Sequence, residues 1–363
     1  MLEGWVVVVA ALGYVLLLFA IASYGDRTAR WTTSGHGRPL IYALSISVYC
    51  TSWTFFGSVG TATRSGLEFL TIYIGPILVF ALGYPLLRRI IRLAKSERIT
   101  SVADFIGARY GKSQPVAAVV AIIAVVGIVP YIALQLKAVS LSVTTMIGRV
   151  DLSGGSPGLP YLDDVTLMIA IGMVVFAWLF GTRHIDATEH QEGLMLAIAA
   201  EAVVKLFAFL AIGIWVTYFL YDGPGDLFSA MAADTRVVDA MAGELSGGNW
   251  VVMTLLSGIA VILLPRQFHV TVTENNSSAE LRRATWLFPL YLVAINLFVV
   301  PIAAAGMIIL GPSTNPDTYV LALPIAADHP WLALLAFVGG LSAATAMVIV
   351  ASVALAIMIS NDL

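Results

Sequence analysis

Hydroxyl side chains cluster in one apolar stretch, residues 42–60, which is long enough to span most of a bilayer. Six serines and threonines lie there with two glycines: Ser45, Ser47, Thr51, Ser52, Thr54, Ser58, Gly57 and Gly60. Such residues favour a broken helix, and irregular backbone at membrane depth is tolerated where it lines a cavity or is buried in protein. A break can offer carbonyl groups and half-helix ends to a solute or an ion. The alternative is a close helix–helix interface, which also favours small residues.

A second polar group lies in the apolar stretch 116–147. Tyr131 and Gln135 are four residues apart, so they share one face of a helix. They form either a cavity wall or an interhelical hydrogen bond. Lys137 follows them, and it is either a charge held deep in the membrane or a side chain that reaches back to the interface.

Glu201 and Lys205 form a third group, again four residues apart with the acid first, which is the favourable order for an ion pair within a helix. We expect a neutralised pair that faces the bundle, with a proton-relay role as the alternative. His269 follows Pro265 and is expected to pack or cap a loop, although a histidine can titrate near neutral pH. The polar run 273–280 is expected to be a hydrophilic cytoplasmic hinge.

The sequence contains no pattern typical of a catalytic site. A P-loop and a plausibly spaced Ser/His/Asp set are both missing. His184, Asp186, Glu189 and His190 come nearest to a metal cluster, but they lie in a short loop. We therefore predict no catalytic residue, no bound metal and no cofactor. Cys50 is the single cysteine, so an intrachain disulfide is excluded.

These groups are embedded in a strongly apolar chain of 363 residues, 59% hydrophobic and 11% charged. A helix needs about 20 apolar residues to cross the hydrocarbon core. About nine candidates meet this length, and they are 4–24, 40–62, 67–93, 116–147, 163–182, 192–221, 249–270, 284–311 and 331–360. The longest loop, 222–248, has room for a short surface helix. The sequence therefore predicts an all-α integral membrane protein, and the net charge of −3 argues against nucleic acid as a partner.

Basic residues predict the orientation. With the N-terminus outside, the inside loops hold fourteen Lys and Arg residues, Arg266 among them, and the outside loops hold three, Arg64, Arg149 and Arg236. This asymmetry follows the positive-inside rule. We expect a multi-pass protein of a bacterial inner membrane with a periplasmic N-terminus and a cytoplasmic loop at 88–112.

Several motifs resemble the sodium/solute symporter family. They are SWTFFGSVG at 52–60, Ser65-Gly66, SVADFIGARYG at 101–111, Tyr131 with Gln135, QFH at 267–269, and GGLSAAT at 339–345 followed by SND at 360–362. The resemblance implies a LeuT-like inverted-repeat bundle in one domain, 1–363, with a leading helix at 4–24 and core helices one to eight at about 40–360. The second repeat would then be incomplete, so we expect further helices after Leu363.

A closer resemblance is to the transporter-like N-terminal domain of CbrA-type sensor histidine kinases, through LPRQFHV at 264–270, TEN at 273–275, LFPLYL at 287–292 and MISNDL at 358–363. It implies an amino-acid solute, histidine as the best single guess, cytoplasmic kinase modules on the same polypeptide and a response regulator as partner. A stand-alone symporter and a solute receptor that transports nothing are the alternatives.

The resemblance also implies site residues. The solute is expected between core helices one, three and six, against Ser52, Trp53, Tyr131, Gln135 and a helix break at Ser257 and Gly258. The family's cation site falls on Ser47, Cys50, Ala343, Ala346 and Met347, where two expected hydroxyl ligands are replaced by a methyl group and a thioether. A shift of one turn would offer Ser342 and Thr345 instead. The coupling ion is expected to be H⁺ rather than Na⁺, with Glu201 as the first protonatable candidate beside Lys205.

Overall fold

The fold is all-helical throughout the described part of the chain, as predicted. The computed structural model describes residues 4–32, 37–147, 160–181, 191–243 and 247–363, without the side chains of 29–32, 160–166, 176–177 and 180–181. The first half contains α1 (Gly4–Thr32), α2 (Gly37–Ser45), η1 (Ile46–Tyr49), η2 (Trp53–Gly57), α3 (Ser58–Ser65), η3 (Gly66–Leu70), α4 (Thr71–Leu82), α5 (Tyr84–Ser96), α6 (Val102–Arg109), α7 (Gln114–Ile147) and α8 (Pro160–Gly181). The second half contains α9 (Glu192–Trp215), η4 (Val216–Leu220), α10 (Pro224–Ala233), α11 (Thr235–Met241), α12 (Gly247–Leu263), α13 (Pro265–Phe268), η5 (His269–Thr273), α14 (Ser278–Asn296), α15 (Val299–Ile309), η6 (Pro316–Thr318), α16 (Tyr319–Ala326) and α17 (Pro330–Asp362).

Many of these helices have membrane character. Six described helical stretches are long and apolar enough to cross a bilayer, and α12 with α13 and η5 makes a seventh if this pair, bent by 55°, counts as one span. Large apolar side chains on outward faces are exposed, for example Ile123 and Val126 of α7 at 65% and 68%. Lipid is the solvent that such a surface fits. The protein is therefore a multi-pass membrane protein.

Helix α17 lies in the middle of the bundle and carries its core. It packs against α7, α9 and α8, and its small residues allow close approach, as its composition predicts. A Cβ atom on Gly339 would lie 2.8 Å from the Phe55 ring, and one on Gly340 would lie 2.1 Å from the Phe56 ring. These two glycines therefore let the segment after the first helix break sit directly on α17.

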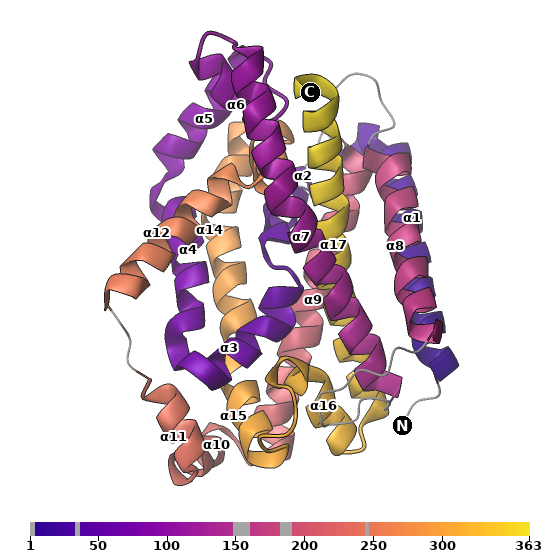
Figure 1. The fold of residues 1–363 in the computed structure, drawn as a ribbon, viewed down its shortest axis with the longest axis vertical. Helices are drawn as coiled ribbons and strands as arrows, with labels where there is room; N and C mark the ends of the chain where they lie inside the picture. The colour runs from indigo at the N-terminus through magenta and orange to yellow at the C-terminus, as the bar shows by residue number, and fades with distance from the viewer. Residues whose placement is uncertain (1–3, 33–36, 148–159, 182–190, 244–246) are drawn as a thin grey trace.

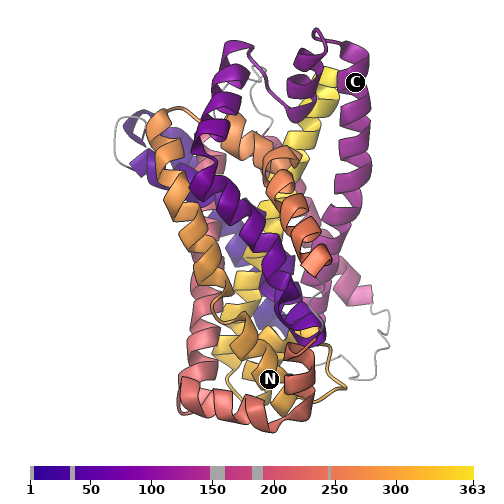
Figure 2. The ribbon, with the colours of Figure 1, turned by 90° about the vertical axis from the view of Figure 1, so that its left-hand side faces the viewer.

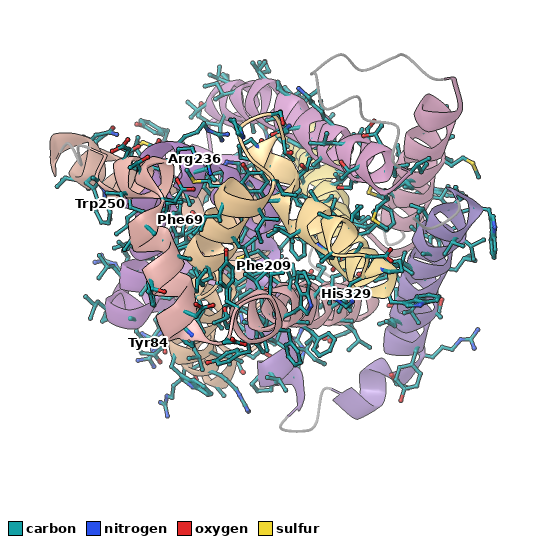
Figure 3. The ribbon with its side chains drawn as sticks, turned by 90° about the horizontal axis from the view of Figure 1, so that it is seen from below. Phe69, Tyr84, Phe209, Arg236, Trp250 and His329 are labelled. Carbon is teal, nitrogen blue, oxygen red and sulfur yellow. The ribbon has the colours of Figure 1, made fainter. Side chains whose placement is uncertain are left out.

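The two ends of the bundle are distinct (Figure 1). Helices α5 and α6 lie at the same end as the last turn of α17, and α1 begins at the opposite end. Figure 2 shows α10 and α11 lying across that opposite end. The same end faces the viewer in Figure 3, where exposed Arg236 lies toward the edge and fully buried Phe209 lies within the bundle. The basic residues of 88–112 are thus separated from Arg236 by the length of the molecule.

Several predicted helices are broken in the structure. The stretch 40–62 divides at Cys50, whose backbone is extended (φ −79°, ψ 101°), between the 3₁₀-helix η1 and the π-helix η2. The stretch 67–93 divides at Gly83, where α4 ends and α5 begins before Pro85. The loop 222–248 holds two helices, α10 and α11, where one was expected.

Candidate functional site

The break in the first core segment is held by α7. The Ser52 backbone N–H and its hydroxyl both donate to Gln135 Oε1, at 3.1 and 2.7 Å. One turn away, the hydroxyls of Thr51 and Tyr131 lie 3.0 Å apart. Tyr131 and Gln135 do share a face, and both bind the break. Ser52 and Gln135 are 4% and 1% exposed, so their interaction is a buried interhelical hydrogen bond.

A cavity of about 480 Å³ opens beside this break. Its aromatic walls are Tyr49, Trp53 and Tyr131, and Thr51 and Thr54 also line it. Apolar residues of α6, α7 and α12 complete the lining. Of the residues predicted to bind solute, Trp53 and Tyr131 therefore line the cavity. Ser52 and Gln135 do not line it, and their hydrogen bonds hold the helix break beside it.

Arg266 is the one charged residue among the described residues that line the cavity. It is 2% exposed, and its Cζ lies 5.0 Å from the centre of the Tyr131 ring, a cation–π contact. Within the described part of the chain, its Nε and Nη1 atoms have no hydrogen-bond partner. A buried guanidinium with unused donors in a largely apolar cavity is costly unless an anion joins it.

The sequence interpretation missed Arg266, which it counted among the inside loops. The structure corrects this, because Leu264 is extended (φ −60°, ψ 126°) and α13 starts at Pro265, directing the next residue inward. The signal was present, since the predicted helix 249–270 contains Arg266. A charge inside a predicted span indicates a buried functional residue, as it did for Glu201.

The break predicted at Ser257 and Gly258 is wrong in position. Helix α12 runs through both residues without interruption. The Ser257 hydroxyl donates to the Thr71 and Thr254 carbonyls, at 2.8 and 2.9 Å. A Cβ atom on Gly75 would lie 2.5 Å from the Gly258 nitrogen, so α4 and α12 approach closely here. Neither residue lines the cavity, and the break lies at Leu264 instead.

Lys205 of α9 also binds the first helix break. It is fully buried, and its Nζ donates to the carbonyls of Ser47 and Cys50, at 2.8 and 2.7 Å. The expected pair with Glu201 is therefore corrected: no ion pair joins the two among the described residues, although both face the bundle. Lys137 differs, because its side chain is exposed on α7.

Glu201 instead joins α9 to α17. The hydroxyl of Thr345 donates to its carboxylate, and the hydroxyl of Ser342 donates to its backbone carbonyl at 2.8 Å. The two hydroxyls considered as alternative cation ligands are thus both engaged as donors. The remaining residues expected from α17, Ala343, Ala346 and Met347, are fully buried and offer no side-chain oxygen.

A buried ion-pair network closes the end of the bundle where α5 and α6 lie. Arg38 Nε lies 2.7 Å from Glu192 Oε1, and its guanidinium also pairs with Glu280, which caps α14 together with Ser277. Burial lowers the pKa of Arg38, but the charges of Glu280 and Glu192 and their hydrogen bonds to the guanidinium together outweigh it, so the pKa lies above its ordinary value. Within the run 273–280, Glu274, Asn275 and Glu280 are buried, whereas residues 276–279 are exposed. His269 is also buried, as a packing residue would be, with Nε2 3.6 Å from Glu274.

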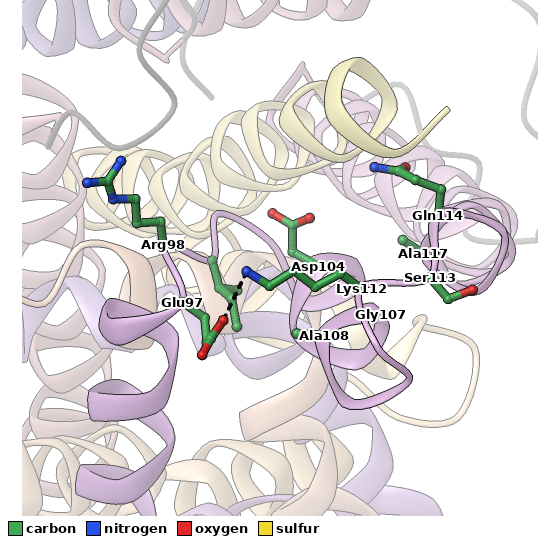
Figure 4. Close-up of a pocket in the computed structure, with 10 residues that line it drawn as sticks. Glu97, Arg98, Asp104, Gly107, Ala108, Lys112, Ser113, Gln114 and Ala117 are labelled. Atoms are coloured by element: carbon green, nitrogen blue, oxygen red, sulfur yellow. Dashed lines mark ion pairs between the residues drawn. The ribbon is translucent and has the colours of Figure 1, made fainter.

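A smaller pocket of about 160 Å³ lies at the same end, between α5, α6 and α7 (Figure 4). Its lining mixes signs: Glu97, Arg98, Asp104 and Lys112. The Lys112–Glu97 ion pair spans 3.0 Å between exposed side chains, and such pairs contribute little. This pocket is a feature of the loop surface, so the cavity beside Arg266 is the better candidate site. The possible metal group His184, Asp186, Glu189 and His190 lies outside the described residues.

Comparisons with known proteins address the fold and the relatives of this chain. No family model matches the chain. Two proteins of Bacillus subtilis (strain 168) are similar, the "uncharacterized symporter YhjB" (25% identical over 324 residues, 87% of this chain and 60% of the relative) and the "uncharacterized symporter YodF" (20% over 297 residues, 81% and 56%). The chain thus spans less than two thirds of the length of either relative.

A solved structure matches the whole chain. It is a Na⁺-coupled sialic acid symporter in its substrate-bound outward-open state, with a TM-score of 0.70, 14% identity and coverage of 100% of this chain and 74% of that one. The fold is LeuT-like. The structural match shows the fold, and the two relatives make the chain similar to proteins named as symporters. The family resemblance in the sequence pointed in the same direction.

Proposed function

We propose that this chain forms the solute-binding part of a membrane transporter, and that its solute is a small polar molecule with a carboxylate group, an amino acid. The observation that carries the proposal is Arg266, buried in the cavity wall with two guanidinium nitrogens unused. A guanidinium binds a carboxylate through two parallel hydrogen bonds, and such charge-assisted bonds are among the strongest in proteins.

The rest of the cavity suits the side chain of an amino acid. Its volume of about 480 Å³ lies in the range of small-molecule sites. Tyr49, Trp53 and Tyr131 provide aromatic side chains, and Thr51 and Thr54 add two polar residues to the lining. An imidazole ring can stack on such faces. Histidine is therefore our specific candidate, supported by the resemblance to the CbrA-type domain.

The same resemblance supports a place for the domain as the input part of a sensor histidine kinase that signals to a response regulator. Binding would bias a downstream helix only to the extent that the solute prefers one state of the bundle. A stand-alone symporter coupled to H⁺ or Na⁺ and a receptor that moves nothing are the alternatives. Counterflow of labelled histidine in liposomes separates them, because a receptor exchanges no label across the bilayer.

The carboxylate is tested with matched ligands on the purified protein. Histidine, its methyl ester and histamine share the imidazole, but only histidine keeps a free carboxylate. We expect histidine to bind at least ~30-fold more tightly than the other two, since a lost charge-assisted hydrogen-bond pair costs about 2–3 kcal/mol. Equal affinity for histidine and histamine would remove Arg266 as the carboxylate site. A panel of other amino acids and carboxylic acids tests the side-chain assignment independently.

A further inference from the structure

The carbonyls at the first helix break form a site for a positive charge. Ser47 lies in η1 and Cys50 directly after it, where the backbone turns extended. Both carbonyl oxygens converge on one point, the Lys205 ammonium, at 2.8 and 2.7 Å. Hard cations such as sodium prefer oxygen ligands of this kind. In this chain the cation at these two oxygens is the ammonium group of Lys205, which is covalently part of the protein.

We infer that Lys205 is a built-in cation, which occupies the position at the Ser47 and Cys50 carbonyls and makes the fold independent of sodium there. A sodium ion at these oxygens would lie within contact distance of an ammonium that is already bound to them, and like charges repel strongly in a buried site. The inference does not rest on the proposed solute and holds whether the domain transports or only binds.

The residues expected to complete a sodium site offer little to the ion. The Ser342 and Thr345 hydroxyls donate to the carbonyl and the carboxylate of Glu201, which ties their oxygens to α9. Ala343, Ala346 and Met347 provide a methyl group, a methyl group and a thioether, which are poor ligands for sodium. The residues at this position therefore do not fit the ion, and they do fit a lysine whose Nζ needs acceptors.

A consequence follows for variants that lack the ammonium. Shortening Lys205 leaves two buried carbonyls without their donor and an empty volume where the side chain was, which is destabilising. A small external cation of suitable size can then bind the bare carbonyls. The variant, unlike the wild type, should become sensitive to the cation in solution.

The test compares thermal denaturation midpoints of the complete purified protein in equal concentrations of choline, sodium and methylammonium chloride. Wild type should show the same midpoint in sodium and choline. Lys205→Ala should lose several degrees in choline and regain part of the loss in sodium or methylammonium. Lys137→Ala, which removes an exposed lysine of α7, is the matched control and should behave as wild type.

An equal response of wild type and Lys205→Ala to sodium would overturn the inference. If Lys205→Ala cannot be purified, Lys205→Met is compared in the same way, because it keeps most of the side-chain volume without the charge. Lys205→Arg keeps a cation and should fold without regard to salt. Failure of the Ala and Met variants in every salt, with Lys205→Arg intact, would show that no external ion can take the position and would also overturn it.

Discussion

Two arginines are almost equally buried in this molecule, and their surroundings differ. Arg38 is 5% exposed and pairs with Glu192 and Glu280. Arg266 is 2% exposed, and among the described ion pairs none includes it. Arg38 ties the starts of α2, α9 and α14 together, whereas Arg266 faces a cavity. Burial alone therefore does not assign a role to a charge. The partner that the chain provides, or leaves out, decides between structure and ligand binding.

The largest expected effect is on the paired arginine. Arg38→Gln leaves two buried carboxylates without their counter-charge, and breaking a buried pair from one side costs about 3–5 kcal/mol. We expect the free energy of unfolding, measured in mixed micelles, to fall by that amount. Arg64→Gln is the control: its ion pair with Asp317 spans 3.5 Å between exposed groups and should contribute less than ~1 kcal/mol. Equal losses in the two variants would show that the network does not hold the bundle.

The unpaired arginine should respond in the opposite way. Arg266→Gln removes a buried charge that bonds no carboxylate, so the loss of stability should be limited to the cation–π contact, about 1 kcal/mol. Histidine binding should weaken about 30- to 100-fold, because the carboxylate loses its charge-assisted partner. Stability and affinity are measured on the same preparation. A variant that unfolds like Arg38→Gln while its affinity is unchanged would assign Arg266 to structure.

The sequence offered a broken first segment as one of two alternatives, and it predicted a common face for Tyr131 and Gln135, in both cases for a physical reason. Clustered hydroxyls and glycines weaken a helix locally, and the four-residue spacing of Tyr131 and Gln135 fixes their common face. Both features are local, so they can be read without the fold. The small residues of α17 are also a local feature, since Gly339 and Gly340 predict a close helix contact without identifying the partner.

The incorrect predictions concern contacts and bends that depend on the folded structure and not on local spacing. Glu201 and Lys205 have ideal spacing for a pair, but Lys205 meets carbonyls more than 150 residues earlier in the chain. Arg266 looked like a loop residue because hydropathy locates a helix end only to within a few residues. The bend at Leu264, and not the composition, directs it into the cavity. The break was misplaced at Ser257 and Gly258 because small residues serve close packing and helix breaks alike.

The smallest expected effect is at Trp53, which tests whether the aromatic wall contributes beside the charge. The indole is half-buried in the cavity lining, and its ring centre lies 6.3 Å from that of Tyr73. Stacking on an aromatic face is worth on the order of 1 kcal/mol, so Trp53→Ala should weaken histidine binding roughly five- to tenfold. Trp53→Phe keeps an aromatic face and should lose less affinity, and Trp331→Ala, on an exposed tryptophan, is the control.

Gly57→Ala sharpens the test without changing the Trp53 side chain itself, because its Cβ would lie 2.7 Å from Trp53 Cδ1 and displace the indole. If the wall acts by stacking, Gly57→Ala and Trp53→Ala should weaken histidine and spare a carboxylic acid that lacks an aromatic group. An equal loss for both ligands would mean that the two substitutions act by disturbing Arg266, and the wall would then have no binding role of its own.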